Sequence, residues 1–302
     1  MNSYDSENPT PLTPISIPLF EQYGVKVCVK RDDFNHPTIQ GNKWHKLKMN
    51  LQQAHRTGAD TLITFGGAYS NHIAATACAA KQHGFKCIGF IRGDELANQP
   101  DRWSPTLIQA AQNGMQLRFL SRMAYREKDS QAFSKKIATE FSQAYLLPEG
   151  GSNLLAVDGF ASLMSDLEHQ QPDWTHIYTA VGTGGTLAGL VKYAKVKPGR
   201  SIQGVAVLKQ ADYLIPQIQK WIGNQPQVDW TLLQNYHGGG YGKTSSELKA
   251  FKDTFEANLN IPLDPVYTAK MVNAFYQELQ LGRIKTGSKV ILLHTGGLQG
   301  NP

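Results

Sequence analysis

The sequence repeats one local pattern: a short run rich in β-branched residues, a glycine-containing turn, and a stretch with helical spacing of apolar residues. Parallel strands need a crossover connection, usually a helix, so this alternation predicts parallel sheets covered by helices on both faces. We expect an α/β fold with open, twisted, mostly parallel sheets. The predicted strands are 25–30, 61–65, 86–91, 176–181, 202–208 and 289–293. The predicted helices are 42–55, 71–83, 104–113 and 186–194.

Composition excludes several classes of protein. With 302 residues, 41% hydrophobic and 18% charged, the chain suits one large domain or two closely packed ones and is not disordered. The net charge is +6, but the basic residues are scattered, so we interpret them as a solvated surface and expect no nucleic-acid partner.

Cysteine usage and the N-terminal segment bear on compartment and partners. Cys28, Cys78 and Cys87 are far apart and form no CxxC pair, so we expect no disulfide framework and no metal site. Residues 1–12 lack a signal-peptide pattern, and no apolar run approaches the roughly 18 residues of a membrane span. These features predict a cytoplasmic protein without a membrane partner.

Ligands of open parallel sheets bind beyond the carboxyl ends of strands, so the strand-to-helix turns are candidate sites. In the first turn, Asn42 after Gly41 is expected to cap a helix and to place Lys43 in its first turn. The helix dipole there lowers the pKa of an amine, and a neutral amine is what Schiff-base formation needs. Lys46, on the same face, could hold a phosphate. Taken alone, this turn fits two surface lysines better.

The second turn leads from Gly66-Gly67 to Ser70, Asn71 and His72. Ser70 or Asn71 is expected to cap the following helix, where free backbone N–H groups would attract a carboxylate. The alternative is a capped helix without further function, with His72 as a structural or rim residue.

The third turn is the most specific. It consists of Gly182, Thr183, Gly184, Gly185 and Thr186. Glycines let backbone N–H groups converge on an anion, and the threonine hydroxyls add donors. No GK[ST] follows, Leu187 breaks the GxGxxG pattern, and the next strand carries no acid for a ribose. We therefore predict a phosphate monoester site rather than a dinucleotide site.

Together with later segments, these turns resemble the fold-type II pyridoxal-phosphate enzymes, and more narrowly the 1-aminocyclopropane-1-carboxylate (ACC) deaminase and D-cysteine desulfhydrase family. The matching segments are 30–33, 41–43, 46–47, 70–72, 182–186, 240–242, 264–267 and 294–297. They occur in the family's order at comparable spacing. Gln40, in place of a glycine before Gly41, departs from the pattern.

The resemblance implies a role for each matching position. Lys43 would hold the aldehyde carbon of pyridoxal phosphate, Lys46 and the loop 182–186 its phosphate, and Asn71 its ring hydroxyl. Ser70, Tyr241 and Tyr267 would act on the substrate as catalytic residues. The substrate-binding group comprises Ser70, Asn71, His72 and Thr295.

The resemblance also implies two α/β lobes with the cofactor in the cleft between them, and a homodimer. Residues 1–45 and 156–302 would form the large cofactor-binding domain, and 46–155 a smaller inserted domain.

Two positions favour one activity within the family. Thr268, expected at the pyridine nitrogen, stands where the deaminases have Glu, and Thr295 where they have Leu. A neutral hydroxyl leaves the ring a weaker electron sink, which suffices for expelling a β-thiol but not for opening a cyclopropane. The sequence therefore predicts a lyase that converts D-cysteine to pyruvate, ammonia and sulfide. The alternatives are ACC deamination and a non-catalytic pyridoxal-phosphate-binding protein.

Overall fold

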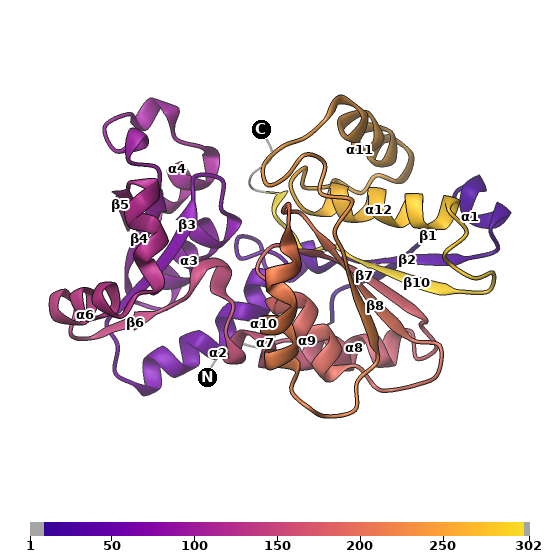
Figure 1. Cartoon of the computed structure of the whole chain (residues 1–302), viewed down its shortest axis with the longest axis horizontal. Helices are drawn as coiled ribbons and strands as arrows, with labels where there is room; N and C mark the ends of the chain where they lie inside the picture. Colours follow the sequence, from indigo (N-terminus) through magenta and orange to yellow (C-terminus); the bar gives the residue numbers. More distant parts are fainter. Residues whose placement is uncertain (1–8, 299–302) are drawn as a thin grey trace.

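The computed structural model describes residues 9–298. It contains two sheets (Figure 1). The larger has the order β1 (Leu12–Ile15), β2 (Lys26–Lys30), β10 (Lys289–Leu293), β7 (His176–Val181), β8 (Ser201–Ala206) and β9 (Asp229–Leu233). The smaller has the order β5 (Met115–Leu120), β4 (Lys86–Arg92), β3 (Thr61–Gly67) and β6 (Ala144–Leu146). Only the β1–β2 pair is antiparallel among these strands, so the prediction of open, mostly parallel sheets is confirmed.

Helices cover both sheets. They are α1 (Pro18–Gln22), α2 (Asn42–Arg56), α3 (Asn71–Gln82), α4 (Pro105–Gln112), α5 (Arg122–Arg126), α6 (Gln131–Glu140), α7 (Leu154–Asp158), α8 (Ala161–Gln170), α9 (Gly185–Tyr193), α10 (Leu214–Ile222), α11 (Ser246–Leu259) and α12 (Thr268–Gln280). Of the larger sheet, one face packs against α8, α9 and α10, and the other against α1, α11 and α12 (Figure 1).

The alternation of side chains along each strand explains why helices pack against both faces of the sheet. In β10, Ile291 and Leu293 belong to one apolar cluster, and Val290 and Leu292 to the other. Successive side chains of a strand point to opposite faces, so a strand buried on both faces reads as a continuous apolar run. The smaller sheet follows the same rule, with α2, α3 and α4 on one face and α5 and α6 on the other.

The strands absent from the sequence prediction are short or lie at sheet edges. These are β1, β5, β6 and β9. β6 has three residues, and β5 carries a glutamine and an arginine among its apolar residues, so their hydrophobic signal is weak. Edge strands face solvent on one side and tolerate polar residues, which explains why a pattern search passes over them.

The two sheets draw on separate stretches of chain. The smaller uses residues 61–146, and the larger uses 12–30 and 176–293. Boundaries at 46 and 156 fall inside α2 and α7, so helices rather than loose linkers join the two parts. The division into domains at these boundaries remains a prediction. Within residues 9–298, no helix has the length and apolarity needed to cross a membrane.

The start of α2 corrects one detail of the sequence analysis. The N-cap is Gly41, with φ +64° and no side-chain capping bond, and Asn42 is the first helical residue. A Cβ on Gly41 would lie 2.0 Å from the Thr295 carbonyl oxygen. The asparagine amide is therefore free for another task, and the glycine allows two strand-end turns to touch.

This contact predicts a large cost for a methyl group at residue 41. Gly41→Ala should lower the free energy of unfolding by more than about 3 kcal/mol, because left-handed strain and a backbone clash add together. Gly58→Ala is the matched control: its φ is +70°, but no atom lies within 4 Å of the new Cβ. The control should cost only about 1 kcal/mol. Equal losses for both variants in urea unfolding would show that the contact with Thr295 is unimportant.

Candidate active site

The N-termini of α2, α3, α9 and α12 and the end of β7 meet around one cavity. The residues that line it are Asn42, Lys43, Lys46, Ser70, His72, Gly150, Ala180, Val181, Gly182, Thr183, Gly184, Thr186, Leu187 and Tyr267. The first, second and third turns of the sequence analysis therefore come together, although 140 residues separate the first from the last. Asn71, Tyr241, Thr268 and Thr295 do not line this cavity and are placed around it by other contacts.

Lys43 is the amine of this cavity. Its Nζ donates a hydrogen bond of 2.7 Å to Asn42 Oδ1 and lies 5.9 Å from the centroid of the Tyr267 ring. Burial lowers the pKa of Lys43 to about 8, and the Asp264 carboxylate opposes this shift. The direction agrees with the sequence analysis, but desolvation is the main cause. With this pKa, about a tenth of the amine is neutral and nucleophilic at pH 7, far more than for an ordinary lysine.

Lys46 is a buried cation without a carboxylate partner among residues 9–298. Its Nζ donates to Ser152 Oγ at 2.9 Å, to the Gly150 carbonyl at 3.0 Å and to Thr183 Oγ1 at 3.4 Å. Burial and the neighbouring Lys43 hold the pKa of Lys46 well below its usual range. A buried ammonium is expensive unless an anion accompanies it, so this arrangement suits a bound dianion.

The loop after β7 adds further donors at the same place. α9 begins after Gly184, which has φ +84°, and the helix has no side-chain cap. Its first amides are therefore available to an anion. Asn42 Nδ2 donates to Thr186 Oγ1 at 2.9 Å, which ties the start of α2 to the start of α9. The hydroxyls of Ser152 and Thr183 lie 2.5 Å apart beside Lys46.

Asn71, the first residue of α3, carries an unsatisfied buried atom. Its Oδ1 is buried and has no hydrogen-bond partner within residues 9–298, whereas its side chain also bonds Asp264. An orphaned buried acceptor is costly, and a hydroxyl donor of a bound ligand would relieve that cost. Ser70 is the N-cap residue of α3, but its hydroxyl caps no amide and remains available.

Tyr241 and Tyr267 form a pair beside Lys43. Their hydroxyl oxygens are 3.4 Å apart, and their rings meet edge-on with centroids 6.1 Å apart. Burial raises the pKa of both phenols, so each is a neutral group that can donate a hydrogen bond. The fold thus brings two tyrosines that are 26 residues apart in the sequence into direct contact.

Asp264 belongs to the matching segment 264–267, but no role was assigned to it from the sequence. Its Oδ1 accepts from the backbone N–H groups of Val266 at 3.0 Å and Tyr267 at 2.5 Å, which fixes the tyrosine. Burial raises the pKa of this carboxyl to about 6. The signal was an Asp-Pro pair just before a helix, which also describes ordinary turns. Ser152, a partner of Lys46, was missed because it comes from a loop with no chemical pattern.

Three further predicted residues make local contacts, through the side chain in Thr268 and His72 and through the backbone carbonyl in Thr295. Thr268 Oγ1 accepts from the Asp264 N–H at 2.7 Å and donates to the Asp264 carbonyl at 3.2 Å. The His72 ring contacts Thr64 Oγ1 at 2.7 Å and lines the cavity, and burial holds its pKa well below the usual range. The Thr295 carbonyl accepts from Asn42 N–H at 3.3 Å. Their roles toward cofactor or substrate remain predictions.

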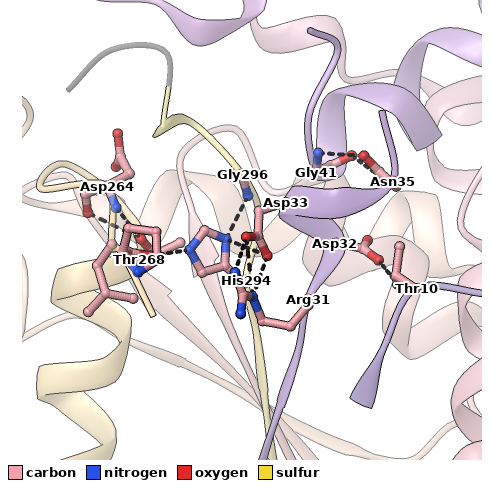
Figure 2. A network of polar contacts seen from close by, with 12 residues as sticks. Thr10, Arg31, Asp32, Asp33, Asn35, Gly41, Asp264, Thr268, His294 and Gly296 are labelled. Carbon is pink, nitrogen blue, oxygen red and sulfur yellow. Dashed lines mark hydrogen bonds and ion pairs between the residues drawn. The ribbon is translucent and has the colours of Figure 1, made fainter. Parts of the chain in front are cut away.

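A buried polar network connects the chain segments that lead into the turns of the site (Figure 2). Arg31 donates to both oxygens of Asp33, and Asp33 Oδ1 lies 3.4 Å from His294 Nδ1. His294 Nδ1 accepts from the Gly296 N–H at 3.2 Å, so the ring proton is on Nε2, which donates to the Pro262 carbonyl at 2.7 Å. The network thereby holds the turn after β10, whose Gly297 packs against Asn71 and Asp264.

A model of the protein family described as pyridoxal-phosphate dependent enzymes matches residues 4–296. The chain belongs to this family. It is 31% identical to a putative 1-aminocyclopropane-1-carboxylate deaminase of Thermotoga maritima, over 98% of this chain and 96% of that protein. It is 28% identical to a D-cysteine desulfhydrase of Klebsiella pneumoniae, over 96% of this chain and 92% of that protein.

Two further relatives agree with this assignment. A mitochondrial bifunctional D-cysteine desulfhydrase/1-aminocyclopropane-1-carboxylate deaminase of Arabidopsis thaliana is 29% identical, over 97% of this chain and 77% of that protein. A crystal structure of an ACC deaminase homologue superposes with a TM-score of 0.80 at 29% identity, covering 96% of this chain and 90% of that one.

The residues of this pyridoxal-phosphate enzyme fit its cofactor. The buried, carboxylate-free Lys46 and the uncapped start of α9 suit the phosphate, and the amine of Lys43 suits the aldehyde. The orphaned Asn71 Oδ1 suits a ring hydroxyl donor. Each of these features would carry a cost or lack a purpose in a protein that bound no such molecule.

The lowered pKa of Lys43 predicts how cofactor uptake depends on pH. Below about pH 8 the amine is protonated and cannot attack an aldehyde, so the rate at which apoprotein gains the visible absorption of bound cofactor should rise through about pH 8. In Asp264→Asn the midpoint should fall by roughly one unit, because a carboxylate that favours the ammonium is removed. Stopped-flow mixing over a pH series measures both. A midpoint near the ordinary lysine value of 10.5 would contradict the prediction.

Proposed function

We propose that the protein is a pyridoxal-phosphate-dependent lyase that releases sulfide from D-cysteine and leaves pyruvate and ammonia. The observation that carries this choice is Thr268, a neutral side chain whose hydroxyl is bonded to the Asp264 backbone. No carboxylate stands at this position to strengthen the electron sink. Loss of a β-thiol needs less of such help than opening a cyclopropane, because the leaving sulfur carries charge away.

The reaction breaks the Cα–H and Cβ–S bonds of the substrate. The electron pair of the Cα–H bond forms the double bond to Cβ, sulfur departs as hydrosulfide with its own pair, and water then releases pyruvate and ammonia. When bound, pyridoxal phosphate supplies the electron sink that acidifies Cα–H. Lys43, neutral in part near pH 8, is the group we assign to take the α-proton.

The other residues bind and orient. Lys46 and the start of α9 hold the phosphate, and Tyr267, whose ring lies near Lys43 Nζ, acts on the substrate together with its hydrogen-bonded neighbour Tyr241. Ser70, at the N-terminus of α3, is placed to donate to the substrate carboxylate, which the helix dipole also attracts. These assignments come from the geometry of this chain and from its family membership.

ACC deamination is the second candidate, supported by relatives at 31% identity that carry this name. One panel separates the two activities: D- and L-cysteine, D- and L-serine and ACC, with pyruvate, sulfide and α-ketobutyrate measured as products. We expect pyruvate and sulfide from D-cysteine at the highest kcat/KM. Release of α-ketobutyrate from ACC without release of sulfide from D-cysteine would overturn the proposed desulfhydrase activity and establish ACC deamination instead.

A non-catalytic protein that only binds the cofactor is the third possibility. Turnover of no amino acid in the panel, by protein that shows the visible band of bound cofactor, would establish it and overturn the proposed lyase. We further propose that the enzyme is a cytoplasmic homodimer that acts on a small amino acid, in keeping with its family. A monomer in sedimentation at micromolar concentration would contradict the homodimer.

A further inference from the structure

A second cavity, of about 770 Å³, opens beside the active site. Its walls come from the carboxyl ends of the smaller sheet: Gly67–Tyr69 after β3, Arg92 at the end of β4, and α5 just after β5. Tyr241 and Gly242 complete the wall on the other side. This is the edge at which open parallel sheets bind ligands, yet none of the cofactor-holding residues lines it.

The charge of this cavity is strongly positive. Of the described residues, five with cationic side chains line it, against two with carboxylates. Arg122 pairs with Glu95 at 3.3 Å, and Lys128 pairs with Glu149 at 3.3 Å, so each acid already has a cationic partner. Within residues 9–298, the Arg92 guanidinium makes no hydrogen bond or ion pair, and the ring that it contacts is that of Tyr125. Arg126 likewise has no carboxylate partner in that part of the chain. Arg92 and Arg126 are therefore the cations of this cavity that no carboxylate of the described chain neutralises.

Arg92 stands at the boundary between this cavity and the active site. Its guanidinium lies 5.9 Å from the centroid of the Tyr125 ring, and Lys128 Nζ lies 5.3 Å from the same centroid. One Arg92 nitrogen would be 3.6 Å from a Cβ on Gly67, next to the turn that leads to Ser70. Burial raises the pKa of Tyr241 and the charge of Arg92 opposes that rise, so the guanidinium is close enough to act on this tyrosine.

The tyrosine pair joins the two cavities. Tyr241 lines the basic cavity and Tyr267 lines the active site, with 3.4 Å between their hydroxyl oxygens. The Tyr267 ring is 5.9 Å from Lys43 Nζ. A ligand that reacts at Lys43 and extends past the tyrosines therefore points toward Arg92. The side chain of cysteine is too short to make use of a space of this size.

We propose that the basic cavity binds a negatively charged group at the far end of the substrate's side chain, so that the enzyme prefers amino acids whose β-substituent ends in a carboxylate. Arg92 and Arg126 would pair with that carboxylate, as guanidinium groups do. The inference rests on the proposed lyase activity and names its substrate class. The bonds broken are again Cα–H and Cβ–S, with sulfur leaving as a thiolate that carries the carboxylate.

Two probes differ in charge at nearly equal size: S-carboxymethyl-D-cysteine and its neutral amide, S-carbamoylmethyl-D-cysteine. We expect the wild-type enzyme to favour the acid by about tenfold in kcat/KM, the size expected of one charge-assisted hydrogen bond. In Arg92→Gln the ratio should fall to near one, and in Arg126→Gln it should fall in part. Arg56→Gln, an exposed arginine at the end of α2, should keep the wild-type ratio.

The ratio distinguishes this inference from the proposed function. Turnover of D-cysteine with no preference for the acid, or with a preference that both arginine variants retain, would overturn the basic cavity and leave the lyase intact. If no amino acid is turned over, calorimetric titration of the holoenzyme with the two probes decides. Tighter binding of the acid that Arg92→Gln abolishes would support the cavity, and equal binding would overturn it.

Discussion

Replacing Lys43 with alanine is expected to lower kcat/KM for D-cysteine by at least about 10³-fold and to remove the visible band of the bound cofactor. Lys43 has two tasks in the proposed reaction, since the same amine holds the aldehyde and takes the α-proton. Within residues 9–298, the hydrogen bond that Lys43 Nζ donates is to Asn42, and burial disfavours the charged form of the amine, so alanine should leave the fold intact. Steady-state sulfide release and the absorption spectrum measure the two effects together.

Lys81→Ala is the matched control for this change. Lys81 is an exposed lysine in the last turn of α3, outside both cavities, and its loss should leave rate and spectrum as in the wild type. Circular dichroism would verify that both variants are folded. A Lys43→Ala enzyme that kept the visible band and a tenth of the wild-type rate would show that another lysine carries the reactive amine.

Replacing Lys46 with methionine should have effects of opposite sign on binding and on stability. Affinity for pyridoxal phosphate should fall by about 10²-fold, because a charge-assisted bond to the phosphate is lost. The apoprotein should be as stable as the wild type or more stable, by up to about 2 kcal/mol, since a buried ammonium with no carboxylate partner within residues 9–298 is removed. Ser152 and Thr183 keep each other as hydrogen-bond partners.

Lys48→Met on the same helix is the comparison for Lys46→Met. Lys48 is also buried, but its Nζ donates to Ser162 Oγ, and it does not line the cofactor cavity. This variant should keep normal cofactor affinity. Equilibrium titration of apoprotein with pyridoxal phosphate and urea unfolding of apoprotein give the two quantities. A Lys46→Met protein that lost apoprotein stability and kept its cofactor affinity would refute a phosphate role for Lys46.

The sequence by itself determined the elements that carry the site. Strands 176–181 and 289–293 were predicted with the bounds that the structure shows, because a strand buried on both faces is continuously apolar. The turns after the strands were recognisable as well, since glycines with positive φ and short polar residues mark places where a backbone turns tightly. The loop 182–186 follows from these local signals, whereas Lys43 and Lys46 fitted surface lysines equally or better until the family resemblance gave them roles.

Only the tertiary structure decided which of these turns contact one another. Lys46 meets Gly150 and Ser152, more than 100 residues away, and Gly41 fits only because the Thr295 carbonyl approaches it. The pKa of Lys43 depends mainly on burial, which a helix position does not reveal, and Asp264 becomes a site residue only through its contacts. The basic cavity is likewise invisible in the sequence, where its five cations look like scattered surface charge. Sequence patterns report local backbone geometry and periodicity, whereas desolvation and charge pairing depend on segments that only the fold brings together.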